Sequence, residues 1–180
     1  MRISDGRYDR DRARLSLALR MIRLGARTQT VRLATWLSKE RIRRLAREYA
    51  SLEGDWAVPR LRGKSPRRMS HFRQTYEHEQ QAATFGCLLL ECELAGPAGS
   101  REAMTSEEAE RFCDVFEMFR YVCPMGLISF EHAWYLRDEL ATRRQYALAA
   151  CQGCRALWIR DTLDLLPDRC PACRTGLYEA

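Results

Sequence analysis

Long hydrophobic runs are missing from this sequence of 180 residues. No stretch of 18 consecutive apolar residues occurs, so the sequence predicts no membrane-spanning helix. The first residues are rich in arginine and lack the apolar core and the small-residue cleavage site that mark a secretory signal. We therefore expect a protein of the reducing cytoplasm, where structural disulfides are rare.

The sequence also lacks the motifs that carry common enzymatic chemistry. It has no glycine-rich phosphate loop, no G-x-S-x-G, no H-E-x-x-H and no paired carboxylates in a motif. Histidine is limited to His71, His78 and His132. Since His78 and His132 fall in predicted helices, we interpret them as structural side chains and not as ligands. The sequence thus predicts neither an enzyme nor a small-molecule substrate.

Lysine is scarce, and the charge is unevenly distributed. Lys39 and Lys64 are the two lysines among 30 basic residues. Residues 1–70 hold 19 basic and 7 acidic side chains, a net charge of +12, whereas residues 71–180 hold 11 and 17, a net charge of −6. The basic first third favours an anionic partner, nucleic acid first and a membrane surface second, because neutralised phosphates release counterions.

Eight cysteines are present, and four of them have metal-ligand spacing. Cys151 and Cys154 form one C-x-x-C pair, Cys170 and Cys173 form another, and fifteen residues separate the pairs, as in four-thiolate zinc sites. A two-residue gap lets both sulfurs of a pair reach one tetrahedral ion at about 2.3 Å. Four thiolates leave no open position for a reactive water. We therefore predict one structural zinc ion per chain.

Two alternative interpretations of these cysteines have less support. A redox dithiol of the thioredoxin kind requires a C-x-x-C at a strand end within a βαβ domain, whereas Cys173 lies seven residues from the end of the sequence. Two disulfides require an oxidising compartment, which the N-terminal residues do not indicate. The remaining thiols lie among apolar residues and are interpreted as small buried groups: Cys87, Cys92, Cys113 and Cys123.

The basic N-terminal third has helical periodicity. The pattern predicts an apolar helix over residues 12–24 with Gly25 as its C-terminal cap. Residues 27–49 then predict a helix, a short turn at Trp36 and a second helix capped by Ser38. This second helix has an apolar stripe and a basic opposite face, and so resembles the recognition helix of a helix-turn-helix. Its candidate DNA contacts are Lys39, Arg41, Arg43, Arg44 and Arg47.

The remainder of the chain predicts a helical core. A basic loop with glycine and proline follows over residues 53–68 and is interpreted equally as a linker or as a phosphate contact. Further helices are predicted over residues 77–95, from a capping box at residues 105–108 to Pro124, and from Ser129 almost directly to Cys151. The apolar residues 157–166 predict a small cluster or short strands.

The predicted fold class is therefore mainly α. We expect a basic, helix-turn-helix-like region over residues 1–70, a helical core over residues 71–150 and a small zinc-ribbon-like module over residues 151–180. Metal binding would supply the stability that this module cannot obtain from its own apolar cluster, about 10 kcal/mol for a structural zinc.

Several short motifs follow one another in an informative order. They are Leu24-Gly25-Ala26-Arg27, Leu37-Ser38-Lys39-Glu40-Arg41-Ile42, Leu45 with Glu48-Tyr49, Gly63-Lys64-Ser65-Pro66, Ala82-Ala83-Thr84-Phe85, Ala133-Trp134 and the two C-x-x-C pairs. Over residues 12–175 this order resembles the FlhC family, one subunit of the bacterial flagellar master transcriptional activator. The departures include Trp36 at the turn and the basic residues that follow Gly63-Lys64-Ser65-Pro66.

The resemblance implies a mainly helical protein whose zinc ligands are Cys151, Cys154, Cys170 and Cys173. It implies a hetero-oligomer with an FlhD-like partner that activates flagellar promoters by contacting promoter DNA and RNA polymerase. Since some relatives regulate transfer genes of mobile elements, that regulon is a second expectation. A third is a zinc-stabilised protein-interaction subunit without direct DNA contact, because the helix over residues 12–24 is apolar around most of its circumference. An RNA-binding zinc protein is favoured least.

Overall fold

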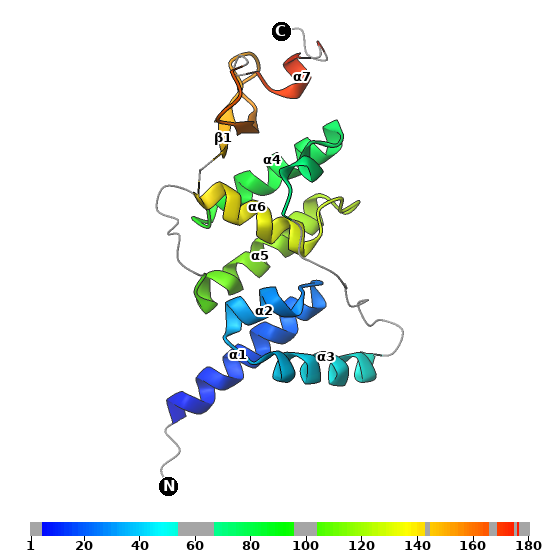
Figure 1. The fold of residues 1–180 in the computed structure, drawn as a ribbon, viewed down its shortest axis with the longest axis vertical. Coiled ribbons are helices and arrows are strands. Elements are labelled where there is room, and N and C mark those ends of the chain that lie inside the picture. Colours follow the sequence, from blue (N-terminus) through cyan, green and yellow to red (C-terminus); the bar gives the residue numbers. More distant parts are fainter. Residues whose placement is uncertain are drawn as a thin grey trace. The chain divides into compact units, whose positions relative to one another are not determined.

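The computed structural model describes residues 5–53, 67–95, 104–142, 145–165, 169–174 and 176. It divides into two compact units, the first with residues 1–65 and 102–114 and the second with residues 66–101 and 115–180. The predicted loop at residues 53–68 falls mostly outside the described residues. The chain is mainly helical, as predicted (Figure 1), and carries a C-terminal cluster of four cysteines. No helix among the described residues combines the length and the hydropathy that a bilayer crossing requires.

Within its described residues, the first unit contains three helices and the beginning of a fourth. These are α1 (Asp5–Arg23), α2 (Thr28–Thr35), α3 (Lys39–Glu53) and the first half of α5 (Ser106–Val122). Leu17, Met21 and Ile42 are fully buried and lie at the centre of this unit. Arg20 of α1 forms ion pairs with Glu110, at 3.0 Å, and with Asp114. The predicted apolar helix thus buries part of its surface within its own unit.

Helix α1 begins seven residues earlier than residue 12, where the apolar pattern begins. In this added segment Gly6, Tyr8, Asp9 and Arg10 are exposed, and Arg10 Nε donates a hydrogen bond to Gly6 O at 2.8 Å. The end of the helix agrees with the prediction. Gly25 has φ 92°. Gly25 N donates to Ile22 O, and Ala26 N donates to Met21 O. This is the Schellman pattern, in which glycine takes the left-handed position.

Helices α2 and α3 form the predicted helix, turn and helix. Trp36 ends α2 in the left-handed region, with φ 59°, and its N–H bonds Arg32 O at 2.9 Å. Ser38 caps α3 as predicted, because its Oγ accepts a hydrogen bond from Arg41 N at 3.3 Å. The buried residues are Thr30, Val31, Ala34 and Thr35 of α2, Leu37 of the turn and Ile42 of α3. The tight turn therefore rests on apolar packing beneath it.

The second unit combines helices with a β-hairpin. It contains the 3-10 helix η2 (Met69–Arg73), α4 (Tyr76–Glu91), the second half of α5, α6 (Phe130–Thr142), β1 (Tyr146–Ala150), β2 (Leu157–Asp161) and α7 (Pro171–Arg174). Its aromatic core is formed by Phe85, Phe116, Phe119 and Phe130, with Phe85 and Phe119 rings 5.2 Å apart. Phe116 and Phe119 of α5 therefore belong to the core of this unit.

The starts of α5, in the first unit, and of α6, in the second unit, follow the sequence prediction. Thr105 and Glu108 form the capping box of α5: Glu108 N donates to Thr105 Oγ1 at 3.1 Å, and Thr105 N donates to Glu108 Oε2 at 2.7 Å. Ser129 Oγ accepts from His132 N at 3.4 Å and caps α6. Helix α4 begins at Tyr76 with Thr75 as its cap.

The predicted end of α4 is wrong by four residues. The helix ends at Glu91, before the helix-breaking pair Gly96-Pro97 that directly follows the predicted helix in the sequence. Glu93 takes the left-handed position with φ 57°, and Leu94 N bonds Leu89 O at 2.8 Å. Leu94 is buried and the buried Arg137 donates to its carbonyl at 3.0 Å, so core packing ends this helix before the breaker is reached.

Strands β1 and β2 pair antiparallel, with Tyr146 opposite Asp161 and Ala150 opposite Leu157. The predicted helix does not run to Cys151, because β1 precedes the first cysteine pair. The hairpin packs on α4 through Leu148. A Cβ placed on Gly86 of α4 would lie 3.1 Å from Leu148 Cδ2, so glycine is what lets the strand approach the helix. The cysteine module and the helical core therefore belong to one compact unit.

All three histidines of the chain meet in the second unit. The His71 ring stacks on the His132 ring with 3.7 Å between centroids, and the His78 ring lies 5.1 Å from His71. His78 Nδ1 lies 2.9 Å from Thr75 Oγ1 and His132 Nδ1 lies 2.8 Å from Ser129 Oγ, each the hydroxyl that caps its own helix. Both rings thus hold helix starts, as expected for structural side chains.

We expect the stability of the chain to fall at mildly acidic pH. Burial lowers the pKa of His71 and outweighs the opposing effect of the hydrogen bond to Leu127 O. The nearby His78 lowers this pKa further. Because the unfolded chain then binds this proton more tightly, the free energy of unfolding falls as pH drops below about 6.5. The slope of the free energy of unfolding against pH stays well under roughly 1.4 kcal/mol per pH unit, the value for uptake of one full proton on unfolding. It is smaller because the His71 ring is partly exposed to solvent.

Urea unfolding at several pH values between 5.5 and 7.5 tests this. His71→Gln keeps a donor for Leu127 O but cannot titrate, so its stability should depend less on pH than that of the parent. An equal pH dependence in both proteins would assign the effect to other groups.

Candidate functional site

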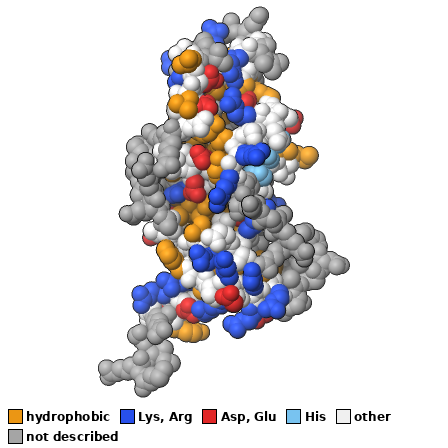
Figure 2. Space-filling model, viewed as in Figure 1, with side chains coloured by type: hydrophobic (Ala, Val, Ile, Leu, Met, Phe, Trp, Pro, Cys, Tyr) orange, Lys and Arg blue, Asp and Glu red, His pale blue; other side chains and the backbone are white. Residues whose placement is uncertain are grey.

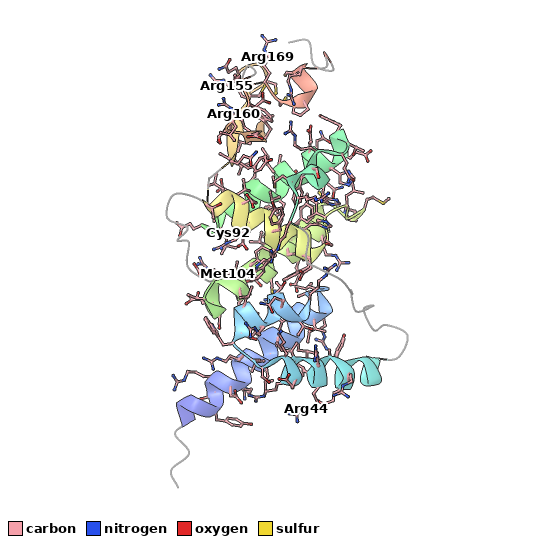
Figure 3. All side chains as sticks on the ribbon, viewed as in Figure 1. Arg44, Cys92, Met104, Arg155, Arg160 and Arg169 are labelled. Carbon is pink, nitrogen blue, oxygen red and sulfur yellow. The ribbon has the colours of Figure 1, made fainter. Side chains whose placement is uncertain are left out.

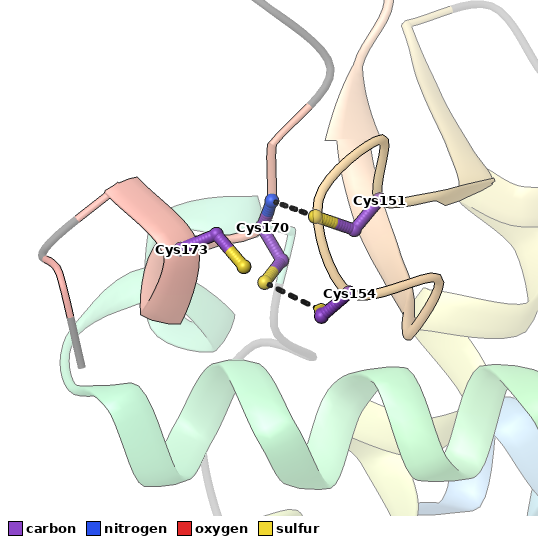
Figure 4. Close-up of side chains that lie close together, drawn as sticks. All are labelled: Cys151, Cys154, Cys170 and Cys173. Carbon is purple, nitrogen blue, oxygen red and sulfur yellow. Dashed lines mark hydrogen bonds between the residues drawn. The ribbon is translucent and has the colours of Figure 1, made fainter. Parts of the chain in front are cut away.

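Four cysteines from two separate segments form one cluster. Cys151 and Cys154 lie in the turn that connects β1 to β2, whereas Cys170 directly precedes α7 and Cys173 lies on it. Their sulfur atoms all lie within 4.8 Å of one another, and Figure 4 shows them pointing toward a common centre. The Cys154 and Cys170 sulfurs are 3.6 Å apart. All four predicted ligands are brought together.

This arrangement fits a tetrahedral metal ion. Four sulfurs at about 2.3 Å from a central ion lie about 3.8 Å from one another, close to the spacing in the cluster. The backbone supports the same geometry: Cys170 N donates to Cys151 Sγ at 3.2 Å, and Arg155 N closes the first turn on Cys151 O at 3.0 Å. The four thiols can therefore hold a metal ion.

The cluster favours negative charge on one sulfur. Backbone N–H groups of Cys154, Cys170 and Gly153 lower the pKa of Cys151 to about 6. The hydrogen bond with Cys154 and the burial of the thiol raise the pKa of Cys173 to about 12. Four crowded sulfurs without a cation thus share protons, whereas a divalent cation stabilises all of them as thiolates.

Neighbouring residues leave room for the sulfurs and cover them. A Cβ placed on Gly153 would lie 3.2 Å from Cys173 Sγ, so this position has little space for a side chain. Trp158 of β2 packs against Cys151 and Cys170. The Arg174 guanidinium lies 5.5 Å from the centre of the Trp158 ring. The sequence pattern did not predict a role for Gly153. The available signal was its position inside the Cys151–Cys154 pair.

No protein-family model matches this chain, and no curated protein is significantly similar to it.

The predicted DNA contacts all lie on α3 but differ in their surroundings. Lys39, Arg43, Arg44 and Arg47 are exposed. Figure 2 shows basic side chains gathered over α3, and Figure 3 shows Arg44 pointing away from α2. Arg44 lies 3.7 Å from Glu48 in a weak pair along the helix. These residues form a basic face opposite the buried Ile42.

Arg41 is held within the first unit. Its guanidinium donates to both carboxylate oxygens of Asp11 in α1, at 3.2 and 2.6 Å. This hydrogen bond and the charge of Asp11 raise the pKa of Arg41. Arg41 thus connects α3 to α1 and differs from the four exposed cations of the basic face.

We expect Arg41→Ala to act on stability and not on DNA contact. Its thermal midpoint should fall, and the double variant with Asp11→Ala should fall by less than the sum of the two single changes, because both changes remove the same ion pair. The slope of log K for DNA against log salt should stay that of the parent, whereas loss of a phosphate contact lowers it by about 1. A lower slope for Arg41→Ala alone would make Arg41 a phosphate contact.

Proposed function

We propose that this chain is a DNA-binding subunit of a transcriptional activator resembling FlhC, which acts in a hetero-oligomer with an FlhD-like partner. Its proposed role is the activation of flagellar promoters in the cytoplasm through contacts with promoter DNA and RNA polymerase. Transfer genes of mobile elements are the alternative regulon. The observation that carries the proposal is the exposed basic face of α3, presented by a capped helix-turn-helix.

The geometry of α2 and α3 supports contact with duplex DNA. A recognition helix must be held by apolar packing on one side and expose its first turns on the other. Ile42 faces the core of the first unit, and Lys39, Arg43 and Arg47 are exposed. Guanidinium groups bind phosphate and guanine edges bidentately, so arginine suits both affinity and base reading.

We further propose that the metal is zinc and that its role is structural. Zinc takes four thiolates in tetrahedral geometry, and such a site offers no position for substrate. The bound ion would supply a cross-link between the hairpin turn and α7. Cys151, Cys154, Cys170 and Cys173 would hold it, while Trp158 covers the buried Cys151 and Cys170.

A protein-interaction subunit without DNA contact is the second candidate. The feature that favours it is a group of exposed apolar side chains at the end of α5 and just beyond it. Met118, Tyr121 and Val122 have the spacing i, i+3 and i+4 of one helix face, and Met125 lies in the turn that follows the helix. The exposed apolar surface that suggests a partner is therefore at the end of α5, whereas α1 buries Leu17, Ala18 and Met21.

One experiment separates the two candidates. The chain is co-expressed with an FlhD-like protein of the same genome, and the purified complex is assayed for zinc and for promoter binding over a series of salt concentrations. A zinc-bearing complex with promoter-selective binding that weakens steeply with salt supports the activator. A zinc-bearing complex that ignores DNA at low salt rejects DNA binding and favours the interaction subunit.

A further inference from the structure

Trp36 combines two features that folding of this chain does not explain. Its backbone lies in the left-handed region, with φ 59° and ψ 15°, a conformation that is costly for residues other than glycine and asparagine. Its side chain is 69% exposed, so burial of the indole does not offset that cost. Glycine would end α2 with less strain. Strain kept at an exposed position points to a contact outside the chain.

The other left-handed side chains behave differently. Among the described residues, Glu93 and Arg155 are the other non-glycine residues with positive φ, at 57° and 64°. Both are exposed and charged, so water solvates them. Trp36 instead presents a large aromatic ring to solvent. Glu93 also ends a helix, and therefore provides a matched control for the backbone strain at Trp36.

The charges around Trp36 indicate the kind of partner. Arg32, one turn earlier on α2, is exposed, and the exposed Lys39 begins α3. Glu40 is the acidic residue of the first turn of α3. Lysine is depleted at protein interfaces, whereas phosphates are contacted by arginine, lysine and neutral N–H donors. An exposed ring that Arg32 precedes and Lys39 follows on the adjoining helix ends therefore suits a DNA backbone.

We infer that Trp36 contacts the DNA backbone beside the first turn of α3. The indole N–H donates to a phosphate oxygen, and the flat face of the ring packs against deoxyribose. The inference rests on the proposed DNA-binding function and adds a residue outside α3 to its contacts. Backbone contacts carry no base information, so loss of the ring weakens binding to promoter DNA and to unrelated duplexes by the same factor.

The test compares Trp36→Gly with the parent in the complex with the FlhD-like partner, after size-exclusion chromatography has established that the complex assembles. Removal of the strain should raise the thermal midpoint by about 2–4 °C. Removal of the ring should lower the affinity for both kinds of duplex by about tenfold, in the range of other aromatic contacts with nucleic acids. Trp36→Phe keeps the ring without the N–H and should lose less affinity. Glu93→Gly should gain similar stability and bind DNA like the parent.

Three results would overturn the inference. If Trp36→Gly binds DNA like the parent while Arg43→Ala weakens binding, the contact is absent but the proposed function stands. If Trp36→Gly fails to assemble with the partner, the ring docks on protein. If the parent complex binds no DNA at low salt, the proposed function and the contact fail together.

Discussion

Cys170→Ser should remove the metal from the chain and unfold the C-terminal module. Cys170 is buried, its sulfur lies 3.6 Å from that of Cys154, and its N–H bonds Cys151 Sγ. A hydroxyl in place of a thiolate leaves three ligands and one weak donor, whereas a structural zinc contributes about 10 kcal/mol or more at neutral pH. We expect the metal content to fall from one ion per chain to about a tenth or less.

The control for this change is Cys92→Ser. Cys92 is a half-buried thiol at the C-terminal end of α4 (Figure 3), outside the cluster. This variant should keep its metal and its thermal midpoint. Elemental analysis of both variants, with amide exchange of β1 and β2, measures the metal and the fold separately. Full metal content in Cys170→Ser would mean that three cysteines hold the ion and that the four-thiolate site is incorrect.

The hairpin shows where sequence patterns stop being informative. Residues 146–150 are rich in alanine, which favours helix, and the sequence therefore predicted a helix up to Cys151. They form β1 instead because their backbone groups pair with β2. The first residue of β2 lies eleven positions after the first residue of β1. Pairing with a distant segment overrides local propensity, and a local pattern does not reveal it.

Helix ends could be predicted where residues of the same segment satisfy or turn the helix backbone. Gly25, Ser38 and the Thr105–Glu108 box act within a few residues of the helix that they cap. The end of α4 depends on Leu94 and Arg137, which meet in the core, and was predicted incorrectly. Local hydrogen bonding can be recognised in a sequence, whereas packing between distant residues requires the structure.

The cysteine site shows the same difference between local patterns, which the sequence reveals, and contacts between distant segments, which it does not. Spacing alone identified the four sulfurs that meet, because each C-x-x-C pair is a local unit. The space that Gly153 leaves for Cys173 and the cover that Trp158 provides are contacts between segments. Among the candidate DNA contacts, the sequence placed Arg41 with Arg43 and Arg47, and its pairing with Asp11 of α1 was visible only in the fold.

Replacing Arg43 and Arg47 together by alanine should produce the largest loss of DNA affinity. Both side chains are exposed on the basic face of α3, four residues apart, and so lie on one side of the helix. Two lost phosphate contacts lower the slope of log K against log salt by about 2, and the affinity at moderate salt by about 10- to 100-fold. Fluorescence anisotropy with promoter and unrelated duplexes over a series of salt concentrations measures both quantities.

The matched control removes the same charge from another helix. Arg111 and Arg120 are exposed on α5. Replacing both by alanine lowers the net charge by as much as replacing Arg43 and Arg47, and it leaves α3 unchanged. If general attraction to DNA explained the binding, both double variants would weaken it alike, because net charge acts at long range. A loss confined to the Arg43 and Arg47 variant would place the phosphate contacts on α3. Equal losses would reject the recognition-helix assignment and leave this chain with only diffuse electrostatic affinity for DNA.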